Sequence, residues 1–279
     1  MSVWQPHALL RAATYLTDCC LRLIRKLHGG MTSGSDEILY PRSPILEAVV
    51  ELRFADIAAP KVLKAASVMK SRYKDRTEEL LVEGSLNFEA KSSSFKNLGR
   101  KVKLSSSDQT DALHIAERNA VWVRLAPYEG WSAFSARLEY ELPKVLKALG
   151  DPKITRIGMR YVNRIDFPVR DELGYHEDYL SYRLLGGKIL EPHDGYKWTL
   201  EKHFPDQGLS AVVQSSTARG EIPDFAAIIF DIDVSVSKDV PSKSDDILSR
   251  LCEMRLLKNK IFEEGITDKA RELFNGPIA

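Results

Sequence analysis

The sequence predicts an α+β protein in which a curved antiparallel sheet packs on long helices. Several stretches alternate apolar and polar residues, as strands with one buried face do. Two longer segments carry apolar residues at helical spacing instead. Strands follow one another through short loops before each long helix, unlike the regular strand–helix alternation of a parallel sheet. Both halves of the chain have this order, so two similar lobes are a further expectation.

Composition limits the classes of function. The 279 residues include 40 Lys and Arg against 39 Asp and Glu, a formal net charge of +1. This balance gives no overall electrostatic reason to bind nucleic acid, although a local basic patch would suffice. No apolar run approaches the ~18 residues that a membrane-spanning helix needs. The cysteines Cys19, Cys20 and Cys252 form no disulfide or metal motif, which favours a reducing, cytoplasmic location.

The first 30 residues differ from the rest of the chain. Their apolar residues recur at helical spacing with arginines on the opposite side, as in a basic amphipathic helix. Residues 1–30 are either a peripheral amphipathic appendage or a mis-assigned start, with translation beginning at Met31. Attachment to a membrane surface is a third interpretation. Residues 31–40 have the composition of a linker.

The N-terminal half is expected to span residues 41–170. Its first strand is residues 45–54, where Leu46 and every second residue after it face the core. Further strands are expected at residues 80–90, 101–105, 112–116, 121–128 and 154–169, and helices at 60–73 and 131–149. Pro143 should kink or divide the second helix. Asn163 falls on an apolar strand face, so we expect a buried amide with local hydrogen-bond partners.

The C-terminal half is expected to span residues 171–279. A helix is predicted around residues 177–185, and antiparallel strands at 197–204, 209–217 and 225–237. A long helix should follow, with Ser242 and Ser244 as candidate N-caps and its end near Glu264. Thr267 can cap a short final helix.

Four segments together resemble a sporadically distributed family of bacterial proteins that has no assigned biochemical function. They are PILEAVVELRF at 44–54, RIGMRYVNRID at 156–166, FDID at 230–233 and NKIFEEGIT at 259–267. The resemblance extends over about residues 41–274. It implies a bacterial cytoplasmic protein encoded by a patchily inherited gene, a pattern common among defence and mobile-element genes. It supplies no catalytic residue to carry over.

The charged strand faces are the first candidate site. If the sheet curls into a groove, its carboxylates could hold Mg²⁺ while its arginines clamp a phosphate. The candidate metal ligands are Glu47, Glu51, Asp231 and Asp233, and the candidate phosphate clamps are Arg160 and Arg164. The alternative is the ordinary solvated face of an antiparallel sheet, on which arginines pair with carboxylates across strands.

A basic run is the second candidate. It contains five cations with no acidic residue between them: Lys91, Lys96, Arg100, Lys101 and Lys103. A loop of this kind can hold a nucleic-acid backbone, and its affinity would then fall steeply with salt. A solvated hairpin connection would have the same composition.

The C-terminal helix is the third candidate. Its apolar stripe is broader than a single sheet contact requires, and it includes Leu251, Met254, Leu257, Ile261 and Phe262. The stripe is either an interface for a protein partner or another copy of the chain, or the inner face of a core helix.

These observations favour a non-enzymatic binding or regulatory component that acts through protein–protein contact, in a setting such as a defence or toxin–antitoxin system. No P-loop, GxGxxG, GxSxG or HExxH motif is present. No cofactor is expected. The alternatives are a Mg²⁺-dependent enzyme acting on nucleotides or phosphates, and a nucleic-acid-binding protein.

Overall fold

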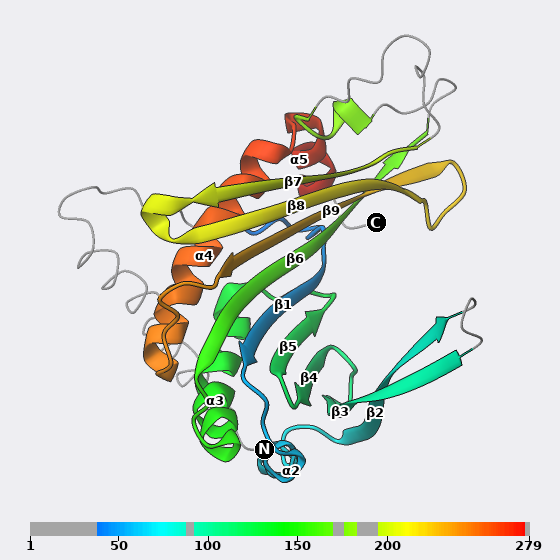
Figure 1. Ribbon diagram of the computed structural model, residues 1–279. Coiled ribbons are helices and arrows are strands. Elements are labelled where there is room, and N and C mark those ends of the chain that lie inside the picture. Colours follow the sequence, from blue (N-terminus) through cyan, green and yellow to red (C-terminus); the bar gives the residue numbers. More distant parts are fainter. Residues whose placement is uncertain (1–37, 88–91, 170–175, 183–194, 277–279) are drawn as a thin grey trace, which may run out of the picture.

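A computed structural model describes residues 38–87, 92–169, 176–182 and 195–276. The predicted appendage at residues 1–30 and most of the linker lie outside this part of the chain. Within it, all strands join one antiparallel sheet in the order β2-β3-β4-β5-β1-β6-β9-β8-β7 (Figure 1). The sheet is not closed, because β2 and β7 remain as its two edges. The strands are β1 Ile45–Phe54, β2 Asp75–Asn87, β3 Ser92–Ser105, β4 Asp111–Ala116, β5 Asn119–Leu125, β6 Ile154–Pro168, β7 Lys197–Phe204, β8 Leu209–Arg219 and β9 Phe225–Val236.

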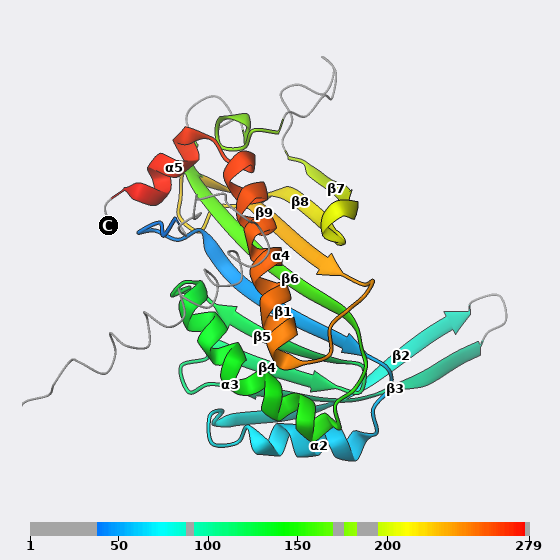
Figure 2. The ribbon, with the colours of Figure 1, turned by 90° about the vertical axis from the view of Figure 1, so that its left-hand side faces the viewer.

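Helices cover one face of this sheet, as Figure 2 shows. The α-helices of the described chain are α2 Ala59–Val68, α3 Trp131–Leu149, α4 Ser244–Gly265 and α5 Asp268–Asn275, with 3-10 turns at His176–Asp178 and Pro205–Gln207. α2 packs against α3, α3 against α4, and α4 against β9 and β6. The predicted mixed α+β class with an antiparallel sheet is therefore confirmed. None of the described helices is long and apolar enough to cross a membrane.

The core fills the space between the helices and the sheet. Many apolar strand residues that face the helices have no exposed surface, among them Val50, Leu52, Trp122, Met159 and Phe230. The helices bury a matching stripe, such as Leu138 and Leu142 of α3 and Ile247 of α4. The burial of these apolar side chains away from water is the main stabilising contribution to such a fold.

The alternation predicted for residues 45–54 is confirmed in β1. Ala48, Val50, Leu52 and Phe54 are buried on the helix side. Leu46 is an exception, because its side chain is 38% exposed. The register of the β1–β6 pair shifts between Ile45 and Glu47, which takes this position out of the strand's alternation.

Two local expectations about helices need correction. α3 is one continuous helix through Pro143, so the proline does not divide it, and the expected kink stays a prediction. Pro143 and Glu139, whose carbonyl loses its hydrogen-bond donor, both lie on the solvent side, where water can bind that carbonyl. The N-cap of α4 is Lys243, which makes no side-chain cap, so neither Ser242 nor Ser244 has that role.

Other local expectations are confirmed. Thr267 caps α5, and its hydroxyl accepts a hydrogen bond from the Ala270 N–H at 3.3 Å. Asn163 is 2% exposed, and its amide donates to the Phe230 carbonyl at 2.9 Å. Of the helix expected around residues 177–185, the structure has the 3-10 turn at His176–Asp178, and residues 183–185 lie outside the described chain.

Candidate functional site

The face of the sheet opposite the helices, here called the open face, carries charged residues at its centre. Strand alternation places Glu47, Val49, Glu51 and Arg53 of β1 on this face. The neighbouring strands β6 and β9 add Arg156, Arg160, Arg164, Asp166, Asp231 and Asp233. Two strands flank β6, so arginines on β6 can reach carboxylates on either side. In Figure 2 the helices lie in front of the sheet, on the face opposite to these residues.

Arg156 links three strands across the open face. Its Nη1 donates to Glu51 of β1 at 3.0 Å, and its Nη2 donates to Asp233 of β9 at 3.0 Å. The side chain reaches these partners by crossing the backbone of Gly158, where a Cβ atom would overlap its guanidinium. Burial raises the pKa of Asp233, and the charge of Arg156 opposes that rise. The ion pairs are half-buried, which makes them less screened than surface pairs.

The two predicted phosphate clamps are each paired with a carboxylate. Arg160 binds Asp231 through Nε at 2.8 Å and Nη2 at 2.6 Å, and Asp231 is only 8% exposed. These hydrogen bonds raise the pKa of Arg160. Arg164 binds Asp166 of its own strand at 2.8 Å. Bidentate pairs of this kind hold both partners in one geometry.

The predicted metal ligands do not form one cluster. Glu47 and Glu51 lie on β1, whereas Asp231 and Asp233 lie on β9, with β6 between them. Two strand spacings separate such residues by about 10 Å, while Mg²⁺ binds each oxygen at about 2.0–2.1 Å. In the part of the chain that the structure describes, no group of three Asp, Glu, His or Cys residues could hold a metal ion. The four predicted carboxylates therefore do not act together as one set of metal ligands.

The predicted basic run is divided between the two faces of β3. Lys101 and Lys103 lie on the open face, and Arg100 on the other. Arg100 lies 3.8 Å from Glu78, and Lys101 lies 3.5 Å from Glu79. Lys91 is outside the described residues, and so is the side chain of Lys96. The described cations of the run thus do not gather into one basic patch.

Next to these lysines, His114 of β4 lies on the open face. Burial, with the charges of Lys101 and Lys103, lowers the pKa of His114 to about 4. Its Nε2 is buried and makes no hydrogen bond in the described structure. The imidazole is therefore neutral at physiological pH.

The predicted partner interface on α4 is mostly inside the core. Leu251 and Met254 have no exposed surface, and Leu257 and Phe262 are each 7% exposed. Ile261 is partly buried against the same core. Four of the five side chains are thus occupied by contacts within the chain, as a core helix requires.

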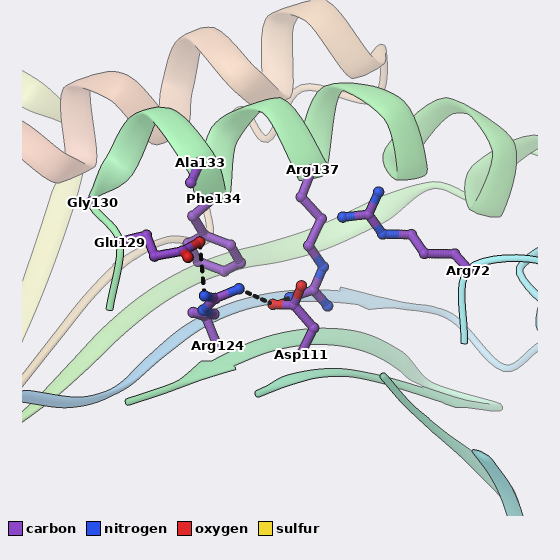
Figure 3. Close-up of a pocket in the computed structure, with 8 residues that line it drawn as sticks. All are labelled: Arg72, Asp111, Arg124, Glu129, Gly130, Ala133, Phe134 and Arg137. Carbon is purple, nitrogen blue, oxygen red and sulfur yellow. Dashed lines mark hydrogen bonds and ion pairs between the residues drawn. The ribbon is translucent and has the colours of Figure 1, made fainter. Parts of the chain in front are cut away.

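A pocket that the sequence did not indicate lies between the start of α3 and the strands β4 and β5 (Figure 3). Its volume is about 230 Å³. The lining residues are Arg72, Asp111, Arg124, Glu129, Gly130, Ala133, Phe134 and Arg137. Asp111 bridges two arginines, at 2.6 Å from Arg137 and 3.3 Å from Arg124.

A buried network supports this pocket. Glu141 of α3 has no exposed surface, and it accepts hydrogen bonds from Tyr73 at 2.9 Å and Trp122 at 3.0 Å. It also pairs with Arg72 at 2.7 Å and Arg137 at 3.4 Å. Arg137 is held by the backbone carbonyls of two strands, Ala112 at 2.6 Å and Val123 at 2.8 Å. Burial raises the pKa of Glu141, and these donors oppose the rise.

The comparisons with known proteins add no identification. No family model and no curated protein matches the chain. One solved structure that aligns over 94% of both chains is the S. pombe Pct1 RNA triphosphatase, with 7% sequence identity and a TM-score of 0.14. A TM-score this low carries no argument about fold or function.

Proposed function

We propose that this chain is a non-enzymatic binding component that recognises a protein partner through the open face of its sheet. The observation that carries the proposal is the ion-pair array centred on Arg156, which spans β1, β6 and β9 on the face opposite the helices. Side chains that are already fixed lose little conformational freedom when a partner binds.

The mixture of side chains on this face supports a protein as the occupant. Val49, Val121, Val162 and Ile229 are partly exposed between the charged pairs. Apolar contacts bordered by arginines and carboxylates are typical of protein–protein interfaces. A nucleic-acid backbone would instead require an excess of cations, whereas here the arginines are matched by carboxylates.

The ion pairs also disfavour the enzyme alternative, because each arginine and most carboxylates already have partners. The family resemblance extends the proposal to a bacterial cytoplasmic protein in a defence or toxin–antitoxin setting. Both the resemblance and that setting remain proposals. The similar order of elements in the two halves is in keeping with two related lobes, which we also keep as a proposal.

The test is native mass spectrometry on C-terminally tagged protein purified from its own host. We expect a stoichiometric protein partner with the wild type and its loss with Val162→Arg, which adds a bulky cation to the open face. Val68→Arg is the matched control, because Val68 is 44% exposed at the end of α2 on the helix side. A partner retained by both variants, or a nucleic acid in place of a protein, would contradict the proposal.

A further inference from the structure

We infer that the pocket at the start of α3 binds a single small anionic group, a carboxylate or a phosphate, in the position that the Glu129 carboxylate occupies. The pocket lies on the helix side of the sheet, so this inference does not rest on the proposed function.

Arg124 supplies the principal donors. Its Nη2 lies 2.8 Å from Glu129, and its Nη1 lies 3.3 Å from Asp111. Its Nε is buried and has no hydrogen-bond partner within the described structure. The side chain of Arg124 is 14% exposed, so water satisfies little of its hydrogen-bonding capacity.

Arg137 and Arg72 add positive charge to the pocket. The side chain of Arg137 is fixed, whereas that of Arg72 can move. Arg137 is 2% exposed and is fully engaged by Asp111, Tyr73 and two carbonyls, so it contributes charge and position. Arg72 pairs with Glu141 through Nε, and its side chain is 40% exposed at the pocket wall. Arg72 can therefore turn its terminal nitrogens towards a ligand while keeping its buried partner.

The acidic and basic residues of the pocket and its supporting network are equal in number only when Glu129 is counted. Asp111 and Glu141 are two buried or nearly buried carboxylates among three arginines, and Glu129 is the third acid. Glu129 differs from the other two because its side chain is 62% exposed. An exposed ion pair contributes little to stability. Exchange of this carboxylate for a ligand anion therefore costs little free energy.

The N-terminus of α3 borders the same position. Gly130 is the N-cap, with φ of 95°, and no side chain caps the helix. Gly130 and Ala133 both line the pocket. The first N–H groups of an α-helix and its dipole favour a negative charge at this end, in addition to the arginines.

The volume limits what the pocket can hold. At about 230 Å³ it is smaller than the ~300–1,000 Å³ of sites that enclose a whole drug-sized ligand. It fits one anionic group, which belongs either to a small free anion or to the end of a longer molecule. A whole nucleotide is too large.

The test is an NMR titration of arginine Nε–Hε signals in low-chloride buffer, with inorganic phosphate and acetate as separate probes. Glu129→Gln removes the competing carboxylate and should strengthen anion binding several-fold relative to wild type. Arg124→Gln should abolish it. Arg53→Gln, which removes an exposed arginine of the open face, is the control and should leave binding unchanged.

A purely structural role for these residues predicts a different result. Glu129 is exposed, so its substitution should leave the fold intact, and wild-type-like spectra would confirm this. Affinity that is unchanged or lower in Glu129→Gln, or absent in both proteins, would overturn the inference. A tighter response to a short peptide acid than to acetate would identify the carboxyl end of a chain as the source. A tighter response to phosphate would identify a phosphate group.

Discussion

The guanidinium of Arg156 lies across the backbone of Gly158, two residues along the same strand, and occupies the space that a side chain there would need. This arrangement lets one arginine pair with Glu51 on one neighbouring strand and Asp233 on the other. The absence of a side chain at Gly158 is thus a condition for the ion pairs at the centre of the open face.

Gly158→Ala should therefore destabilise the protein by displacing Arg156. We expect a loss of about 1–3 kcal/mol in the free energy of unfolding, from crowding and from the weakened ion pairs. The same substitution in an Arg156→Ala background should cost less, since the overlapping group is gone. Urea unfolding of the four proteins of this cycle measures the difference. Equal costs in both backgrounds would refute the role assigned to Gly158.

Glu141→Leu should be among the most destabilising substitutions in the chain. It removes the buried carboxylate that pairs with Arg137 and accepts from Tyr73 and Trp122. Breaking a buried ion pair typically costs about 3–5 kcal/mol, because the remaining charge stays buried. Glu139→Gln, two residues away on the exposed side of α3, should change stability by less than ~0.5 kcal/mol. Similar unfolding midpoints for both variants would contradict the network.

His114 should make stability depend on pH. In the folded protein its pKa falls from the usual 6.5 of histidine to about 4. Between these values the unfolded chain binds a proton that the folded protein does not, so stability falls as the pH is lowered through this range. In His114→Gln the unfolded chain binds no proton at this position. The variant should therefore lose less stability than wild type between about pH 7 and pH 5. Parallel losses in wild type and variant, measured by urea unfolding, would show that His114 is not responsible.

Magnesium should leave the melting temperature unchanged, because the carboxylates of the open face pair with arginines and do not cluster. Asp231→Asn should still lower stability, by about 1–3 kcal/mol, through the loss of its charged pair with Arg160. Differential scanning fluorimetry with and without Mg²⁺ and nucleotides separates the two effects. A stabilisation by Mg²⁺ that Asp231→Asn abolishes would restore the enzyme hypothesis.

Much of the fold follows from local pattern. The alternation in β1 places its apolar residues against the helices, and Thr267 caps the last helix as its position indicates. Pro143 does not divide α3, because the effect of a proline depends on whether its freed carbonyl faces water, which is a tertiary property. Leu46 was misjudged because a register shift cannot be read from one strand alone.

The candidate sites were less predictable. Alternation puts the carboxylates of β1 and β9 on the same face, but only the strand order shows that β6 separates them. The pocket combines Arg72, Asp111, Arg124 and Arg137, which share no motif or spacing in the sequence. They meet because β4 and β5 lie beneath α3, an arrangement set by long-range pairing.

If a protein partner covers the open face, it should shield the lysines there, and lysine acetylation footprinting of the isolated complex measures this shielding. Lys101, Lys103 and Lys197 lie on this face, whereas Lys64 of α2 and Lys147 of α3 are exposed on the helix side. The partner should protect the first group several-fold and leave the second group as reactive as in the free protein. Protection confined to Lys64 and Lys147 would place the partner on the helices and contradict the claim.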